Sequence, residues 1–243
     1  MERGIQPVAH MRSEFPEKFG VPRQSGLVEA LKGELLLEPP FRTPDALRGI
    51  EGFSHLWLIW GFHKAQKENW SATVRPPRLG GNQRMGVFAT RSPFRPNGLG
   101  LSCVKLESVE WDGPEGPVLH VSGADLVDGT PIYDIKPYVP YADCRPEATE
   151  GFAPAPGEGL RVAIPPELEE RVPGEKREAL RGVLACDPRP HYQDDPGRVY
   201  GMAFAGLEVR FTVAGETLTV TGVEEGTADM GAGPFGKKQE GQK

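Results

Sequence analysis

The stretch from Leu99 to Ser122, LGLSCVKLESVEWDGPEGPVLHVS, contains two apolar runs separated by Gly113 and Pro114. Short runs rich in aliphatic residues and bounded by glycine and proline are typical of β-strands. The stretch therefore predicts two neighbouring strands, at Leu99–Trp111 and Pro117–Ser122. A turn at the Gly-Pro pair would connect them.

The first of these predicted strands changes its apolar phase. Leu99, Leu101 and Cys103 occupy alternate positions, and the apolar residues then move to the other parity at Val104 and Leu106. Successive side chains of a strand point to opposite faces of the sheet. The change of phase therefore predicts a β-bulge near the middle of the strand.

Similar apolar runs, separated by turn residues, continue through the N-terminal two-thirds of the chain. One short helix is indicated at residues 43–45 (Thr-Pro-Asp), where a hydroxyl cap precedes a proline and an acid. A sheet of many short strands leaves its edges exposed unless it closes, so the pattern predicts a mainly β protein built on a small closed β-barrel. The further predicted strands are Pro7–Met11, Leu27–Leu37, Phe53–Phe62 and Met85–Thr90.

The composition agrees with a turn-rich β protein and excludes other classes. The 243 residues include 31 glycines and 25 prolines, which is more than a helical bundle tolerates. The longest apolar run, Leu56 to Phe62, is far shorter than the roughly 20 residues of a membrane helix. The opening MERGIQPVAH lacks the apolar centre of a signal peptide. We therefore expect a cytoplasmic protein with no membrane partner. Three scattered cysteines predict neither a disulfide framework nor a metal site.

A change in composition divides the chain. Residues 145–159 (RPEATEGFAPAPGEG) are rich in proline, glycine and glutamate, as linkers are. Beyond them, Pro166–Ala185 predicts a helix that is interrupted at Pro173. Leu207–Val213 and Thr217–Val223 alternate cleanly and predict a hairpin. The expected division is a barrel domain at 1–145, a linker at 146–159, a small α+β C-terminal domain at 160–228 and a disordered tail at 229–243.

Charge is unevenly distributed along the chain. The net charge is −6, yet no acidic residue lies between Glu68 and Glu107, so the interval carries +6 and the remainder −12. A cationic interval on an otherwise acidic protein predicts a local site for an anion. The alternative is that these cations scatter over several faces of the fold. They are Arg75, Arg78, Arg84, Arg91, Arg95 and Lys105.

Two segments combine a stiff backbone with cationic side chains. Residues 15–24 (FPEKFGVPRQ) would present Arg23 and Gln24 from a proline-held loop, which suits a carboxylate or a purine edge. Residues 74–97 (VRPPRLGGNQRMGVFATRSPFRPN) interleave five arginines with prolines and two phenylalanines. Such a pattern is compatible with stacking on bases. The alternatives are a surface crossover for the first segment and ordinary core positions for the phenylalanines.

Candidate acid–base groups lie in a third segment, residues 123–141 (GADLVDGTPIYDIKPYVPY), and at His63. Asp125 and Asp128 precede turns, where a carboxylate either binds ligand hydroxyls, takes a proton, or merely caps the turn. His63 follows an apolar strand, at a position where a structural histidine is the alternative. No phosphate loop, dinucleotide fingerprint, zinc-protease motif or nucleophile elbow occurs in the sequence.

Four long motifs in order closely resemble those of the YaeB/TsaA-like (TrmO) tRNA methyltransferases. They are FPEKFGVPRQ at 15–24, FRTPDALRGIEGFSHLWLIWGFH at 41–63, VRPPRLGGNQRMGVFATRSPFRPN at 74–97 and DLVDGTPIYDIKPYVPY at 125–141. The resemblance covers about residues 5–145, and DPRPHY at 187–192 is similar to the family's C-terminal domain. It implies a homodimeric β-barrel enzyme that uses S-adenosylmethionine to methylate the N6 nitrogen of threonylcarbamoyladenosine next to the anticodon of a tRNA.

The resemblance also implies site residues. Asp128 or Asp125 is the expected base that removes the N6 proton, with His63 as the rival candidate. Leu101, Phe88 and Val127 are expected to wall a water-poor pocket. Arg75, Arg78, Arg84 and Arg95 are expected to hold tRNA phosphates or the threonyl carboxylate. The implied cofactor contacts are Pro22, Arg23, Gln24, His63, Lys64, Arg91, Leu101, Asp125, Leu126, Val127 and Asp128.

The chain departs from the family pattern in two places, and two other functions stay open. Residues 98–100 read Gly-Leu-Gly where Pro-Ile-Gly is usual, and residues 5–7 read Ile-Gln-Pro where a glycine is more typical. One alternative is a non-catalytic module that binds S-adenosylmethionine or a nucleotide and regulates a partner. The other is a methyltransferase that acts on a protein or a small metabolite.

Overall fold

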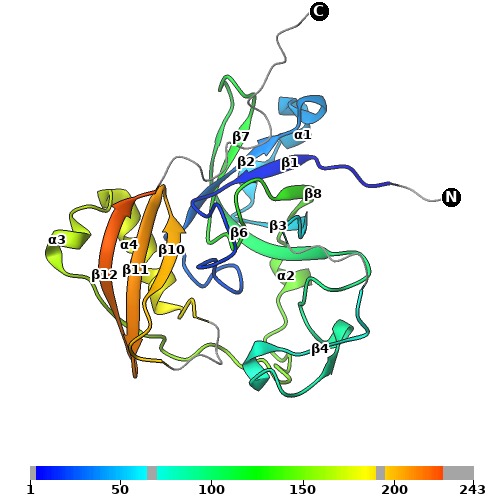
Figure 1. The fold of residues 1–243 in the computed structure, drawn as a ribbon. Helices are drawn as coiled ribbons and strands as arrows, with labels where there is room; N and C mark the ends of the chain where they lie inside the picture. The colour runs from blue at the N-terminus through cyan, green and yellow to red at the C-terminus, as the bar shows by residue number, and fades with distance from the viewer. Residues whose placement is uncertain (1–3, 65–69, 190–194, 227–243) are drawn as a thin grey trace, which may run out of the picture.

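The computed structural model describes residues 4–64, 70–189 and 195–226, and shows a barrel beside a smaller sheet (Figure 1). The predicted tail at 229–243 lies outside the described residues, as do residues 190–192 of the DPRPHY motif. Within the described ranges, no helix is both long and apolar enough to cross a bilayer. The mainly β fold class, with a closed barrel followed by a small α+β part, is confirmed.

Six antiparallel strands close the barrel in the order β1-β2-β7-β6-β3-β8, and β8 returns to pair with β1. Strand β3 lies between β6 and β8, so residues at its C-terminal end face two other strands. This order brings the end of β3 and the start of β6 to the same rim. The strands are β1 (Ala9–Arg12), β2 (Lys32–Leu37), β3 (His55–Gly61), β6 (Leu99–Glu110), β7 (Val118–Ser122) and β8 (Pro131–Pro137).

The bulge in β6 lies further along the strand than predicted. The register shift occurs between Leu106 and Ser108, opposite β7. From Ser102 onward the buried positions of β6 keep one parity through Val104 and Leu106, while Leu101 is exposed. The predicted alternation of Leu99, Leu101 and Cys103 therefore marks the outer face of the barrel. The inner face begins with a serine, which hydropathy does not reveal.

Other predicted elements are partly corrected. The strand expected at Met85–Thr90 is only the two-residue β5 (Met85–Gly86), paired with β4 (Thr73–Val74), and continues as a 3₁₀ turn at Val87–Ala89. Residues 27–31 of the strand expected at Leu27–Leu37 form turns, and β8 was not predicted as a strand. Helix α1 (Pro44–Leu47) forms where predicted, although the Thr43 hydroxyl makes no capping bond. Short turns of 3₁₀ helix also occur at Pro39–Phe41, Ile50–Gly52 and Pro77–Leu79, and α2 spans Pro140–Asp143.

The C-terminal part is a four-stranded sheet covered by helices (Figure 1). The predicted break in the helix is confirmed, since α3 ends before Pro173 and α4 begins at Gly174. The predicted hairpin is also confirmed as β11 and β12, whose buried residues alternate. Strand β9 adds in parallel to β12. The elements are β9 (Arg161–Ala163), α3 (Pro166–Glu169), α4 (Gly174–Ala185), β10 (Tyr200–Phe204), β11 (Leu207–Ala214) and β12 (Thr217–Glu225).

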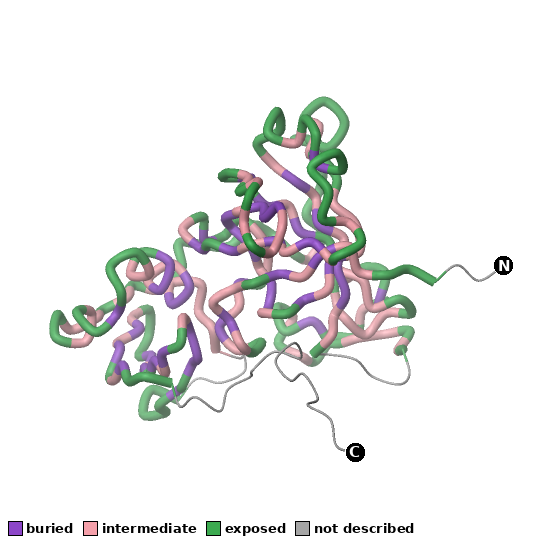
Figure 2. Tube along the Cα trace, turned by 90° about the horizontal axis from the view of Figure 1, so that it is seen from above, coloured by how far each residue is buried: buried purple, intermediate pink, exposed green. Residues whose placement is uncertain are grey.

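Two hydrophobic cores hold the fold, and Figure 2 shows buried backbone within both parts. The barrel core includes Met11 and Leu126. The second core joins the helices and sheet of the C-terminal part, yet it also takes in Phe15, Val28 and Leu31 from the N-terminal sequence. The segment between β1 and β2 is therefore buried against the C-terminal part.

Polar contacts fix the same segment. The Ala205 amide donates to the Glu14 carbonyl at 2.9 Å, and Lys176 of α4 forms an ion pair with the Glu14 carboxylate. Gly20, buried at φ +95°, lies so close to Met202 that a Cβ at this position would overlap the Met202 side chain. The C-terminal sheet thus supports the loop that carries residues 15–24.

The Gly20→Ala variant is expected to lose about 2–4 kcal/mol in its free energy of unfolding. About 1–2 kcal/mol comes from the left-handed backbone, and the rest comes from overpacking against Met202. Gly49 is the matched control, because it also has positive φ (+86°) but an added Cβ there would meet no other atom within 4 Å. Urea denaturation should show a smaller loss for Gly49→Ala; equal losses would contradict a tight contact at Gly20.

Candidate functional site

A cavity of about 710 Å³ opens at the rim of the barrel where β3 ends and β6 begins. Four separate segments line it, namely residues 18–24, 59–64, 90–101 and 125–130. Its volume is within the range of sites for small ligands and cofactors. Among the described lining residues there are five lysines or arginines and one carboxylate, Asp125. The wall therefore combines apolar surface with an excess of positive charge.

A hydrogen-bonded chain crosses one wall of the cavity. Strand pairing places Trp60 of β3 opposite Gly100 of β6, and the absence of a side chain at Gly100 leaves room for the indole. Trp60 Nε1 donates to Ser102 Oγ at 2.9 Å, and Ser102 Oγ donates to Asp125 Oδ1 at 2.5 Å. Two strands of the barrel thereby fix a carboxylate that belongs to the loop after β7.

Burial raises the pKa of Asp125 above the ordinary carboxyl value. The hydrogen bond from Ser102, bonds from main-chain amides and the charge of Arg91 act in the opposite direction. A carboxylate with a raised pKa holds a proton more readily than a surface aspartate does. Asp125 therefore has the character of an acid–base group in a partly dry pocket.

A second wall comes from the segment that the C-terminal part supports. Arg91 Nη1 donates to Gln24 Oε1, and Gln24 Nε2 donates to the Arg23 carbonyl at 2.5 Å. Arg23 Nη2 in turn donates to the Arg189 carbonyl at 3.1 Å. Burial lowers the pKa of Arg23, partly offset by the charge of Asp187. Side chains of residues 23–24 and Arg91 and the main chain of Arg189 are thus connected by hydrogen bonds at the cavity.

His63 and Lys64 extend the wall beyond the end of β3. Burial, Lys64 and His10 lower the pKa of His63, while the Asp128 carboxylate and a hydrogen bond to the Asp128 main chain oppose the shift. These surroundings therefore favour the neutral form of the ring. Lys64 Nζ donates to the Pro16 carbonyl, which connects this wall to the loop at residues 15–24.

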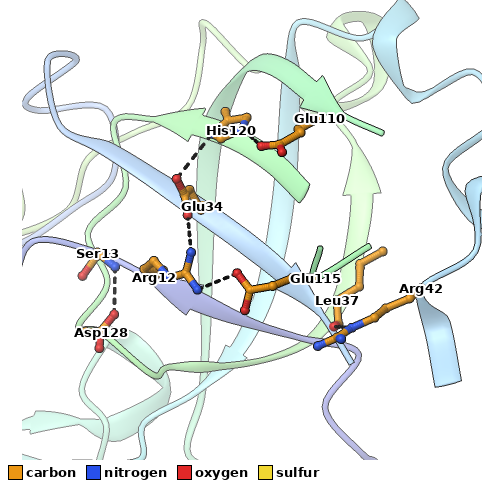
Figure 3. A network of polar contacts seen from close by, with 9 residues as sticks. All are labelled: Arg12, Ser13, Glu34, Leu37, Arg42, Glu110, Glu115, His120 and Asp128. Carbon is orange, nitrogen blue, oxygen red and sulfur yellow. Dashed lines mark hydrogen bonds and ion pairs between the residues drawn. The ribbon is translucent and has the colours of Figure 1, made fainter. Parts of the chain in front are cut away.

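Asp128 does not line the cavity, in contrast to its neighbours Asp125, Leu126 and Val127. Its carboxylate accepts a hydrogen bond from the Ser13 amide at 3.0 Å, as Figure 3 shows. The same view shows Arg12 bridging Glu34 of β2 and Glu115 of the turn between β6 and β7. Asp128 thus fastens the loop after β7 to the end of β1.

The predicted RNA-binding arginines are divided between the cavity and the arm made by β4, β5 and the turns around them. Arg95 lines the cavity and donates to the Thr90 carbonyl at 2.9 Å. Arg84 Nε donates to Thr73 Oγ1 at 2.9 Å within the arm, and Arg78 donates to the Pro154 carbonyl. Arg75 is exposed. The arm therefore presents three exposed arginines outside the cavity.

The structure brings together ten of the eleven predicted cofactor residues, all except Asp128. Sequence reasoning missed Trp60 and Ser102, and it considered Phe94 for stacking on bases but not for the cavity wall. Trp60 was visible as part of an apolar strand, but no signal in the sequence marked Ser102. Phe88, expected in the apolar wall, is 74% exposed, and Phe94 lies in the wall instead.

Comparison with known proteins gives matches along almost the whole described chain. A family model of the tRNA-methyltransferase O N-terminal domain matches residues 10–144, and one of the TrmO C-terminal domain matches residues 158–226. A tRNA (adenine(37)-N6)-methyltransferase from Escherichia coli (strain K12) is 44% identical over 229 residues, covering 90% of this chain and 97% of the relative. A putative S-adenosylmethionine-dependent methyltransferase, RcsF, from Pseudomonas aeruginosa PAO1 is 45% identical, covering 87% and 93%.

Solved structures give the same result. The crystal structure of TrmO from Pseudomonas aeruginosa is similar with a TM-score of 0.74 at 38% identity, covering 92% of this chain and 100% of that chain. A second crystal structure of TrmO has a TM-score of 0.74 at 39% identity, covering 92% and 99%. The similarity in sequence and in fold therefore extends over both parts of the molecule.

The Gly100→Ala variant is expected to displace the Trp60 indole, because the added Cβ would overlap the ring. Overpacking of this kind lowers the free energy of unfolding by about 1–3 kcal/mol. Gly86→Ala is the control, since Gly86 has ordinary φ and nothing within 4 Å. Urea denaturation with the near-ultraviolet circular dichroism of the tryptophans checks the result; a Gly100→Ala protein that matches the wild type in both would contradict the close packing.

Proposed function

The chain belongs to the tRNA-methyltransferase O family, and we infer that it is an S-adenosylmethionine-dependent methyltransferase that acts on the N6 nitrogen of adenine 37 in tRNA. We propose in addition that this adenine already carries the threonylcarbamoyl group. The observation that carries the inference is the cavity at the barrel rim, which unites the predicted cofactor residues in a chain related to the family over both parts.

The lining residues fit S-adenosylmethionine. The cofactor's carboxylate suits the guanidinium of Arg91 or the ammonium of Lys64. Apolar side chains such as Leu126 and Val127 supply surface for the adenine and exclude water from the reacting atoms. When bound, the cofactor supplies an electrophilic methyl group on a sulfonium sulfur.

The positive charge at and beside the cavity supports an RNA substrate. Arg95 lies in the cavity wall, and Arg75, Arg78 and Arg84 lie on the exposed arm. We propose that the arm contacts phosphates of the tRNA, because phosphate contacts fix the position of a nucleic acid without reading its sequence. The threonyl carboxylate adds a negative charge beside the acceptor nitrogen, which favours the modified base in a cationic cavity.

We propose that Asp125 takes the proton from N6 as the nitrogen gains its methyl group. The lone pair of this nitrogen is delocalised into the purine and the carbamoyl carbonyl, so removal of its proton aids methyl transfer. Asp125 lines the cavity, and burial raises its pKa toward the range of an effective base. Asp128 is proposed instead to hold the Ser13 main chain, and the neutral His63 to contact the cofactor.

We propose a homodimer, which would cover large exposed apolar side chains such as Leu101 (49%) and Tyr141 (89%). A cytoplasmic location is proposed because the tRNA substrate is used there. We also propose the domain boundaries near residues 145 and 160, with residues 1–145 as the S-adenosylmethionine-binding domain.

The function is tested with purified protein, S-adenosylmethionine and tRNA that carries threonylcarbamoyladenosine, followed by mass spectrometry of the digested nucleosides. We expect the mass of one added methyl group on the modified adenosine and none on tRNA that lacks the threonylcarbamoyl group. Cofactor binding without methyl transfer to tRNA would instead support the regulatory module. Turnover that is independent of tRNA would support a different acceptor.

The Asp125→Asn variant is expected to lower kcat by about 100-fold or more, since a general base contributes typically 10²–10⁴-fold. Its affinity for S-adenosylmethionine, measured by calorimetry, should change only a few-fold. Asp128→Asn is the matched control, because an asparagine oxygen still accepts the bond from the Ser13 amide. A larger loss of kcat in Asp128→Asn than in Asp125→Asn would refute this assignment.

A further inference from the structure

A buried serine stands behind the proposed base. Ser102 is 1% exposed and lies on the inner face of β6, where its neighbours of the same parity are the aliphatic Val104 and Leu106. A buried hydroxyl at such a position is unfavourable unless both its donor and its acceptor capacity are used. Ser102 uses both, through Trp60 at 2.9 Å and Asp125 at 2.5 Å.

The donor and acceptor chemistry of Trp60, Ser102 and Asp125 sets the direction of the two hydrogen bonds. The indole nitrogen of Trp60 only donates, so Ser102 Oγ accepts at that contact. The one hydroxyl proton of Ser102 is then directed to Asp125 Oδ1. The carboxylate thereby receives a fixed side-chain donor on Oδ1, and main-chain amides of Ser25 and Asp125 also donate to it.

From this geometry we propose that Ser102 is a positioning residue for Asp125, and that Trp60 orients Ser102. The proposal rests on the proposed function, in which Asp125 takes the N6 proton. Ser102 acts in two ways, by holding the carboxylate in one rotamer and by stabilising its ionised form. A base that stays ionised and correctly aimed transfers the proton more efficiently.

The Trp60 indole is itself held in place by the packing around it. Trp60 is 8% exposed, and its ring packs edge-on against Phe62 with centroids 4.3 Å apart. The backbone of Gly100 passes under the indole where any Cβ would overlap it. The nitrogen that donates to Ser102 is therefore placed by the barrel and not by the ligand.

Charged groups around Asp125 come from several elements. Arg91, from the segment between β5 and β6, and the Ser25 amide both favour the ionised carboxylate, as Ser102 does. His63 is the imidazole among the described residues of the wall, and burial lowers its pKa and so favours its neutral form. Loss of the Ser102 hydroxyl removes one stabilising donor, so the carboxylate of the variant protonates at higher pH than that of the wild type.

The barrel contains a second hydrogen-bonded pair of a buried serine and a carboxylate, Ser122 and Glu107, which serves for comparison. Ser122 is 2% exposed on β7 and donates to the Glu107 carboxylate at 2.6 Å. This bond and the nearby Lys105 and Lys32 lower the pKa of Glu107 to about 2. Glu107 lies on a different face of the barrel and does not line the cavity. Ser122→Ala therefore removes a hydrogen bond from a buried serine to an exposed carboxylate without touching the site.

The test compares Ser102→Ala, Trp60→Phe and Ser122→Ala with the wild type, with threonylcarbamoyl-modified tRNA as substrate. We measure kcat, the KM for S-adenosylmethionine and the pH dependence of kcat, and check folding by circular dichroism. For Ser102→Ala we expect kcat to fall about 10-fold at neutral pH, as for loss of a hydrogen bond to a charged group. Its KM should stay within a few-fold, and the acid limb of the profile should move to higher pH.

The other variants separate positioning from general destabilisation. Trp60→Phe keeps an aromatic ring and removes the donor, so it should move the acid limb in the same direction by a smaller amount. Ser122→Ala should leave the acid limb of the pH profile unchanged. The proposal would be overturned if a folded Ser102→Ala protein had the same acid limb in its pH profile of kcat as the wild type. It would also be overturned if Ser122→Ala moved this limb as far as Ser102→Ala does. Failure of the wild type to methylate this tRNA would instead overturn the proposed function.

Discussion

The pairing of β3 with both β6 and β8 is the constraint on which the rest of the site depends. Closure of the barrel leaves β3 no freedom of register, because a shift by one residue would turn its buried Leu56 and Leu58 outward. The same register sets Trp60 over Gly100 and within reach of Ser102. The geometry of the cavity rim is therefore stabilised by the apolar core of the barrel.

The second support of the site comes from the C-terminal sheet. Phe15, Val28 and Leu31 are buried in the core of that sheet, and the loop between them carries Arg23 and Gln24 to the cavity. The barrel alone would leave these large side chains exposed to water, with a loss of about 1.5–3 kcal/mol for each. The wall formed by residues 18–24 is thus a product of both parts of the chain.

The sequence predicted the fold class because its apolar runs have strand length and are separated by turn residues, and the family resemblance located ten residues of the cavity.

The sequence did not predict the features that depend on tertiary contacts. Leu101 has the hydropathy of a core residue but lies outside the barrel, and Ser102 lies inside because Trp60 and Asp125 satisfy its hydroxyl. Asp125 and Asp128 look equivalent in sequence, but Asp125 lines the cavity and accepts a bond from Ser102, whereas Asp128 accepts one from the Ser13 amide. Strand β8 was not predicted, because Pro131 and Pro137 lie at its two ends and Gly129 precedes it.

The central claim, that the cavity at the barrel rim holds S-adenosylmethionine, is tested most directly by the indole N–H resonances of the tryptophans during a titration with the cofactor. Trp60 lines the cavity, whereas Trp111 follows the far end of β6. The predicted result is a saturable shift of the Trp60 resonance, identified from its absence in Trp60→Phe, with Trp111 unchanged. Saturable binding of the cofactor that leaves the Trp60 resonance undisturbed would contradict the claim.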